Sequence, residues 1–208
     1  WAFVFLPKRW PWALTLGYVV AAMLIAFIYP SVIAPIFDKF YPLQDQAILG
    51  DIRDLTDKAG MEVGEVLVME ASVRTARANA YFAGVGGSRQ VVLYDNLINT
   101  HTQEQVKLVV AHEMGHWRYG HVAKGLAFSA IGVAGVLLAF SLAVGRMPPS
   151  SYASLERTLL LLLIVSTLAG YVLSPASSFI SRKHEVAADA YSLELTADPG
   201  TFISTQVH

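Results

Sequence analysis

The chain has 208 residues, of which 54% are hydrophobic and only 15% carry a charge, and its formal net charge is -1. This balance gives no indication of nucleic-acid binding, and the hydrophobic excess is unusual for a soluble protein. Cysteine is absent, which excludes disulfides, zinc-thiolate sites and a cysteine nucleophile, so His, Asp or Glu must hold any metal. The composition therefore favours a membrane protein.

Three stretches without Asp, Glu, Lys or Arg are long enough to cross a bilayer core, which needs about 20 apolar helical residues. We expect transmembrane helices over residues 10–37, 125–145 and 158–174, with a short loop over 146–157. Pro30 and Pro35 predict that the first helix stops or bends near Tyr29. Pro175 predicts a kink or a break after the third helix.

Residues 38–124 hold most of the charge and are predicted to form a soluble α+β insert. Apolar spacing predicts a helix over residues 44–59, with Gly60 as its C-terminal stop. Runs rich in Val, Leu and aromatic residues predict strands over 65–70, 79–83 and 90–94, with a turn over 84–88. We expect these strands to form a small antiparallel sheet.

A second helix of the insert is predicted to begin near Gln103, with Thr102 as its N-cap. Its inner face is continuous through the apolar residues Val106, Val109, Val110 and Met114. The helix thus extends to a segment in which His112, Glu113 and His116 fit the pattern H-E-x-x-H. The two histidines lie four residues apart on one helical face, where both can bind one zinc ion. Glu113 is placed to act as the general base on the metal-activated water.

A catalytic zinc usually takes three protein ligands, so a third ligand is needed. In metzincins a Gly and a His follow at fixed offsets, and Tyr119 and Val122 occupy those positions here. The ligand must therefore be distant, and a carboxylate on another helix fits a His₂Glu set. Glu185 is the best candidate because Asp189 follows at helical spacing and can orient a zinc-bound imidazole, whereas Glu194 lacks such a partner.

Topology supports Glu185 as the third ligand. Two predicted crossings separate His116 from Glu185, so both residues lie on the same side of the membrane. The segment 175–208 is predicted to form the helix that carries this ligand. The remaining histidines are interpreted as structural or surface residues: His101 in a loop, His121 near the membrane surface, His184 at a surface or interface, and His208 at the chain end.

Four separated segments resemble the integral-membrane CaaX prenyl endopeptidases, zinc proteases that remove the C-terminal tripeptide after a prenylated cysteine. The segments lie at 29–40, at 79–84 (Asn-Ala-Tyr-Phe-Ala-Gly), at 112–121 and at 181–190. The resemblance implies a mainly α, multi-span membrane protein with a small gluzincin-like α+β metallopeptidase insert. It implies one Zn²⁺ per chain, bound by His112, His116 and Glu185, with Glu113 as general base and Asp189 as supporting carboxylate.

The resemblance also implies that the strand beginning at Asn79 and Ala80 binds an extended substrate, which fits strand addition through main-chain hydrogen bonds. Family members have seven spans and further His and Arg elements, so we expect this chain to be a fragment. His184 stands where the family has an aromatic residue.

The sequence therefore predicts a zinc metalloendopeptidase that acts on peptide or protein substrates, with prenylated substrates among the candidates, and that resides in a lipid bilayer. The membrane is a bacterial inner membrane or the endoplasmic reticulum, and a slight excess of Lys and Arg predicts a cytosolic catalytic side. One alternative is an HtpX-like quality-control protease with the same site. Another is a non-catalytic, zinc-stabilised membrane scaffold.

Overall fold

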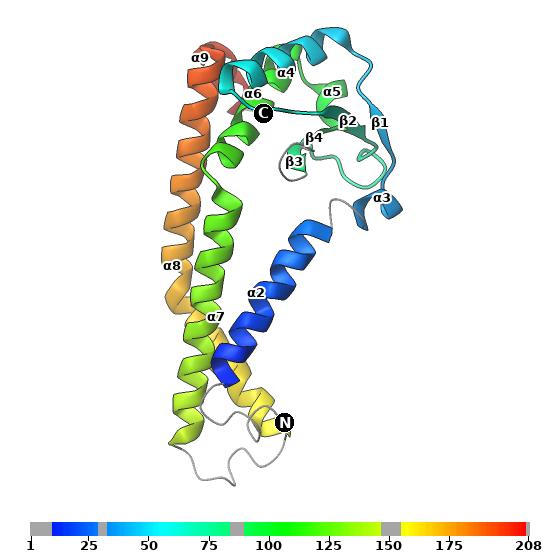
Figure 1. The fold of residues 1–208 in the computed structure, drawn as a ribbon. Helices are drawn as coiled ribbons and strands as arrows, with labels where there is room; N and C mark the ends of the chain where they lie inside the picture. The colour runs from blue at the N-terminus through cyan, green and yellow to red at the C-terminus, as the bar shows by residue number, and fades with distance from the viewer. Residues whose placement is uncertain (1–9, 29–32, 84–89, 147–154, 207–208) are drawn as a thin grey trace. The chain divides into compact units, whose positions relative to one another are not determined.

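The computed structural model describes residues 10–28, 33–83, 90–146 and 155–206. The chain divides into two compact units, one within residues 1–24 and 122–182 and the other within residues 25–121 and 183–208. Figure 1 shows the helices α2 (Trp10–Ile28), α3 (Ala34–Phe37), α4 (Gln46–Ala59), α5 (Asp95–Thr100), α6 (Gln103–Arg118), α7 (His121–Gly145), α8 (Leu155–Thr196) and α9 (Pro199–Gln206). The strands are β1 (Phe40–Pro42), β2 (Glu65–Met69), β3 (Ala80–Ala83) and β4 (Gln90–Tyr94).

The first unit is formed by α2, α7 and most of α8. Trp10 is 3% exposed and packs edge-on against Phe140, with ring centroids 5.9 Å apart. The Tyr18 hydroxyl donates a hydrogen bond to Ser129 Oγ at 3.2 Å, which also joins α2 to α7. These contacts use little of the apolar surface, because Val172 on α8 is 77% exposed and Ile131 on α7 is 72% exposed.

Within the described residues, two helices are long and apolar enough to cross a membrane, spanning His121–Val144 and Glu156–Thr196. A core helix of a soluble protein would bury its apolar side chains, whereas those of α7 and α8 are mostly exposed. The first predicted span, over residues 10–37, is shorter in the structure, since α2 ends at Ile28, close to the stop or bend predicted near Tyr29. Tyr29 and Pro30, to which the predicted end of this helix was assigned, lie outside the described residues.

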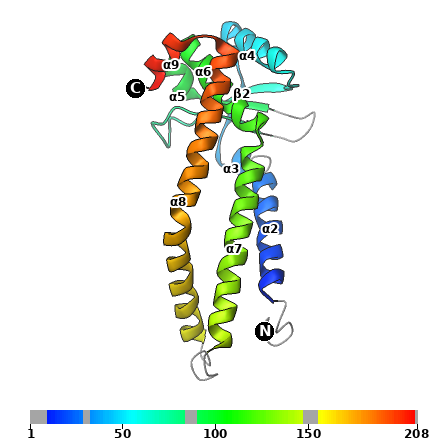
Figure 2. The same ribbon diagram turned by 90° about the vertical axis from the view of Figure 1, so that its left-hand side faces the viewer.

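The helix α8 is continuous through Pro175 (Figure 2), so of the predicted kink or break the break is absent. Proline removes one backbone N–H donor, and helices in a membrane tolerate this where neighbouring groups satisfy the freed carbonyl. The third predicted span and the helix carrying the third ligand are therefore one element, which begins at Leu155 within the region expected to be a loop.

The second unit contains a four-stranded sheet in the order β1-β2-β4-β3. All three predicted strands are present, and β1 is an additional strand. The expectation of an antiparallel sheet is wrong in one pairing, because β2 and β4 are parallel, with Glu65 opposite Gln90 and Met69 opposite Tyr94. The β3–β4 pair is antiparallel, and the turn predicted to join these strands lies outside the described residues.

The Asp95 side chain joins the segments that follow the parallel strands β2 and β4. Its Oδ1 accepts hydrogen bonds from the backbone N–H groups of Ala71 and Ser72, both at 2.9 Å. These residues follow β2, and Asp95 follows β4. Because parallel strands end at the same edge of a sheet, one carboxylate can bind both segments.

The two faces of the sheet bury different clusters. Val91 and Leu93 of β4 join the main core, which includes Ile52 and Leu55 of α4 and Val110 of α6. On the opposite face, Val92 packs with Met69 and Ala71, against Tyr81 and Tyr94. This alternation follows from the two-residue period of a strand. The predicted mainly α fold with a small α+β insert is therefore confirmed.

Candidate active site

Helix α6 begins as predicted and carries the H-E-x-x-H segment in its last turns. The Thr102 side chain accepts a hydrogen bond from Gln105 N, and the Gln105 side chain accepts one from Thr102 N. This reciprocal capping box satisfies two backbone donors at the helix start. The face packed into the core comprises Val106, Val110 and Met114. His112 and His116 lie one turn apart and are each partly exposed.

His112, His116 and Glu185 form a group of three side chains that can hold a metal ion. The two Nε2 atoms of the histidines are 3.0 Å apart. Glu185 Oε2 lies 3.5 Å from His112 Nε2 and 3.6 Å from His116 Nε2. Three atoms from two helices therefore converge on one point.

These separations fit a tetrahedral zinc ion. Bonds of about 2.0–2.2 Å from zinc to nitrogen or oxygen place two tetrahedral ligand atoms about 3.3–3.6 Å apart. The two separations from Glu185, 3.5 and 3.6 Å, lie in that range, and the 3.0 Å between the two histidine nitrogens is slightly shorter. Since the group supplies three donors, a fourth position is left for water, as in catalytic zinc sites.

Asp189 lies one turn beyond Glu185 on α8 and contacts the metal-ligand group from behind. Its Oδ1 is 2.8 Å from His112 Nδ1. A carboxylate on this nitrogen places the imidazole proton on Nδ1 and leaves Nε2 free to bind a metal. The structure therefore places Asp189 beside His112, where it can orient this imidazole.

Glu113 lies next to this group and is mostly withdrawn from solvent. Burial raises its pKa to about 7; the nearby imidazole of His112 opposes the shift, and the negative charge of Glu185 reinforces it. A general base is most effective when its pKa lies near the working pH. The environment of Glu113 is therefore suited to proton transfer.

Burial also lowers the pKa of His116, and the neighbouring His112 lowers it further, with Glu185 acting in the opposite direction. A lowered pKa keeps the imidazole neutral near pH 7, and the neutral ring is the form that binds metals.

The model of peptidase family M48 matches residues 42–208 of this chain. The chain belongs to this family.

Two curated relatives extend the likeness over almost the whole chain. An uncharacterized metalloprotease, YhfN of Bacillus subtilis, is 30% identical over 95% of this chain and 48% of its own length. CAAX prenyl protease 1 of Saccharomyces cerevisiae is also 30% identical, over 91% of this chain and 46% of its own length. The chain spans about half the length of the curated relatives it matches.

The crystal structure of S. mikatae Ste24p superposes on this chain with a TM-score of 0.78 and 26% identity, covering 99% of this chain and 53% of that one. Membership of the M48 family implies a bound metal ion, and the His112, His116 and Glu185 group is where the described residues can hold one.

The interpretation of His121 as a residue that needs no role at the site misses a contact of this M48 chain. His121 is 7% exposed, and its Nδ1 lies 3.0 Å from His116 Nδ1. Its ring also stacks on that of His184, with centroids 4.0 Å apart. Helical spacing from His116 would not place His121 here, because Gly120 has a φ of +61° and redirects the chain. Gly120, next to the last turn of the predicted helix, was the available signal.

Ala80 begins β3, an edge strand of the sheet, and Asn79 directly precedes it. Asn79 is exposed, and its Oδ1 accepts a hydrogen bond from Ala80 N at 2.9 Å, while its carbonyl accepts one from Tyr94 N. Neither residue belongs to the metal-ligand group, and their role in substrate binding stays a prediction.

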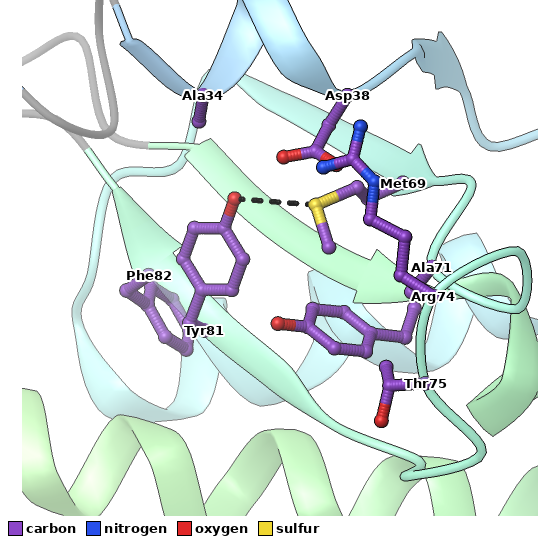
Figure 3. Close-up of a pocket in the computed structure, with 9 residues that line it drawn as sticks. Ala34, Asp38, Met69, Ala71, Arg74, Thr75, Tyr81 and Phe82 are labelled. Carbon is purple, nitrogen blue, oxygen red and sulfur yellow. Dashed lines mark hydrogen bonds and ion pairs between the residues drawn. The ribbon is translucent and has the colours of Figure 1, made fainter.

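A cavity of about 440 Å³ lies on the sheet face opposite the main core (Figure 3). Tyr81, Tyr94 and Met69 form its apolar walls, and the Tyr81 hydroxyl points to Met69 Sδ at 4.0 Å. Arg74 and Asp38 form an ion pair of 2.6 Å beside it. None of its described lining residues belongs to the metal-ligand group.

Proposed function

We propose that this chain is the catalytic part of a membrane-embedded zinc metalloendopeptidase. The observation that carries the proposal is the position of Glu113, a carboxyl group with a pKa of about 7 beside three converging metal ligands. A structural metal site needs the ligands alone, whereas a peptidase also needs a proton acceptor beside the metal.

Each residue of the site has a separate task in this proposal. Zinc bound by the three ligands would act as a Lewis acid, polarising the scissile carbonyl and acidifying a water molecule. The Glu113 carboxylate takes the proton from the attacking water and delivers it to the leaving amine. Asp189 holds His112 in the tautomer that binds metal through Nε2.

Replacing Glu113 with Gln in the full-length protein tests the catalytic role. We expect Glu113→Gln to keep bound zinc and to lose peptide cleavage by at least about 100-fold, because general-base catalysis contributes about 10²–10⁴-fold. Glu104→Gln, an exposed change on the same helix, is the control and should leave cleavage unchanged. Cleavage retained by Glu113→Gln would contradict the mechanism, and a wild-type protein that binds zinc without cleaving any peptide would indicate the scaffold.

For the substrate, we propose prenylated peptides processed near their C-terminus. The support is the similarity to CAAX prenyl protease 1 of yeast and to Ste24p. A panel that compares prenylated peptides with the same peptides lacking the lipid, and with unfolded membrane proteins, tests the substrate class. Preference for the prenylated peptides is expected, whereas equal cleavage of unfolded membrane proteins would favour an HtpX-like quality-control protease.

We propose that the edge of β3 binds the substrate backbone beside the zinc site. An extended peptide can pair with an edge strand through main-chain hydrogen bonds, which give affinity with little sequence selectivity. The Asn79 side chain, bonded to Ala80 N in the free chain, would then turn to the substrate. Asn79→Ala should raise KM or lower kcat without loss of zinc, and unchanged kinetics would exclude this role.

The catalytic unit is proposed to face the cytosol. Basic residues near the span ends are slightly more numerous on the catalytic side, and cytoplasmic loops carry an excess of Lys and Arg. Those on the catalytic side are Lys39, Arg118, Lys124, Arg182 and Lys183, and those on the other side are Lys8, Arg9, Arg146 and Arg157. The described residues contain no cysteine, so a single introduced cysteine can report on which side of the membrane its position lies. In sealed inverted vesicles, an impermeant maleimide should label Glu62→Cys but not Arg146→Cys. The reverse pattern would overturn the orientation.

A further inference from the structure

The two metal-binding imidazoles differ in what holds their second nitrogen. His112 Nδ1 lies 2.8 Å from the Asp189 carboxylate. His116 Nδ1 lies 3.0 Å from another imidazole, the Nδ1 of His121. We propose that His121 is a positioning residue that fixes the tautomer and the ring orientation of His116 for metal binding. This inference rests on the proposed zinc site.

The proton between the two rings can be assigned from the metal-binding role of His116. A nitrogen that binds a metal carries no proton, so Nε2 of His116 is unprotonated and Nδ1 holds the proton of the neutral ring. His116 Nδ1–H then donates to His121 Nδ1. His121 is consequently the acceptor, and its own proton lies on Nε2. The pair therefore favours the one neutral tautomer of His116 that can bind zinc.

The position of His121 is well determined by its surroundings. Its side chain is 7% exposed, and its ring lies nearly parallel to that of His184, with an interplanar angle of 9° and centroids 4.0 Å apart. The Tyr119 ring is a second near-parallel neighbour, 5.7 Å away. Gly120 adopts the left-handed conformation that returns the chain toward α6. Because the His121 ring is fixed by these neighbours, it can fix the orientation of the His116 ring.

His184 acquires a role through the same arrangement. It precedes the third ligand, Glu185, on α8, and it stacks on the residue that contacts His116. The stack therefore joins the start of α7 to the α8 turn that carries Glu185. An aromatic side chain at position 184 would preserve the stack, since stacking needs a planar ring rather than an imidazole nitrogen.

Two substitutions of His121 distinguish the role of its Nδ1 acceptor from the role of its ring in packing. Asn places an amide oxygen near the position of His121 Nδ1, and Leu has nearly the same volume without an acceptor. We expect His121→Leu to lower zinc affinity about 10- to 100-fold, as loss of a group that orients a metal-binding histidine does elsewhere. His121→Asn should restore most of that affinity. His101→Leu, the same change outside the site, is the control.

The measurements use the full-length protein in detergent. Zinc affinity is obtained by competition with a chromophoric chelator, and Co²⁺ replacing Zn²⁺ reports the ligand geometry through its visible spectrum. His121→Leu should alter the Co²⁺ spectrum, whereas His121→Asn and His101→Leu should not. If His121→Leu does not fold, His121→Phe replaces it, because Phe keeps a ring for stacking but lacks the acceptor.

Equal zinc affinity in the Asn and Leu variants, whether as high as in the wild type or equally reduced, would overturn the role of His121. Failure of the proposed function gives a different result. In that case the wild-type protein itself binds no zinc, or Glu113→Gln still cleaves peptides, whatever happens at position 121.

Discussion

Gly115 and Ala188 bring α6 and the C-terminal part of α8 into direct backbone contact. A Cβ atom on Gly115 would lie 2.8 Å from Ala188 Cα and 3.2 Å from Ala188 O. Both residues are buried. Gly115 precedes the ligand His116, and Ala188 lies between Glu185 and Asp189. The metal-ligand group therefore depends on the absence of one side chain at position 115.

Gly115→Ala should separate the two helices, because the atoms in the way belong to the backbone of α8 and cannot turn aside. We expect a loss of stability of about 1–3 kcal/mol, the usual cost of overpacking, together with weaker zinc binding and slower cleavage. Thermal unfolding and chelator competition measure both effects. Gly50→Ala on α4, where a Cβ would meet nothing within 4 Å, should instead be neutral or stabilising. Wild-type zinc affinity in Gly115→Ala would refute the argument.

A second prediction distinguishes the two glutamates that the sequence offered as third ligand. Glu185 Oε2 lies 3.5–3.6 Å from the two histidine Nε2 atoms, whereas Glu194 is exposed two to three turns further along α8. Glu185→Gln should reduce bound zinc strongly, because an amide oxygen is a much weaker ligand than a carboxylate. Glu194→Gln should retain the full zinc content. Metal analysis of the purified variants checks this, and the opposite ranking would identify Glu194 as the ligand.

Asp95 should make the stability of the sheet sensitive to acid. Burial alone would raise its pKa, but hydrogen bonds from Ser72, Asn96 and Ala71 outweigh that effect and hold the pKa below its usual value. A carboxyl whose pKa is lower in the folded state stabilises the fold above the unfolded pKa of about 3.9, and this contribution is lost as the pH falls below it.

Asp95→Asn should therefore cost about 1–3 kcal/mol at pH 7, since the bonds to a charged acceptor are weakened. The difference from the wild type should shrink as the pH falls from about 5 to about 3. Thermal unfolding of both proteins across that range measures the difference, with the exposed Asp54→Asn as control. A difference that does not change with pH would show that the charge of Asp95 is unimportant.

The sequence predicted those parts of the site that depend on helical periodicity. The spacing of His112 and His116 and that of Glu185 and Asp189 follow from the period of 3.6 residues, which holds along any regular helix. The cap at Thr102 follows from the residues preferred at the start of a helix. The expectation that Glu185 can meet His116 came from counting apolar stretches, and the structure brings the two side chains within 3.6 Å of each other. Residues that lie one turn apart on a single helix can therefore be predicted from the sequence before the fold is known.

The features that sequence reasoning missed arise where regular structure ends. His121 reaches His116 because Gly120 takes a positive φ, and periodicity does not predict where the chain goes after such a residue. Likewise, the parallel pairing of β2 with β4 depends on the carboxylate of Asp95 binding Ala71 and Ser72 across the connection. Local strand patterns do not encode the order of strands in a sheet.

The last prediction concerns Glu113 in the metal-free protein. Its pKa of about 7 exceeds the value of about 4.3 expected in the unfolded chain, so the folded state prefers the neutral carboxyl. For an acid with a raised pKa, the stability present below the unfolded pKa is lost as the pH rises toward the folded one. The metal-free wild type should therefore weaken between about pH 4 and pH 7, and Glu113→Gln should not share that loss.

Unfolding in the presence of a chelator at pH 5 and pH 8 measures this difference. At pH 8 we expect Glu113→Gln to be more stable than the wild type by on the order of 3 kcal/mol, with a smaller gap at pH 5. Saturating zinc should reduce the gap at pH 8, because a nearby cation favours the ionised carboxylate. Equal stability of the two metal-free proteins at both pH values would mean that Glu113 is not desolvated, and its suitability as the general base would then lose its physical basis.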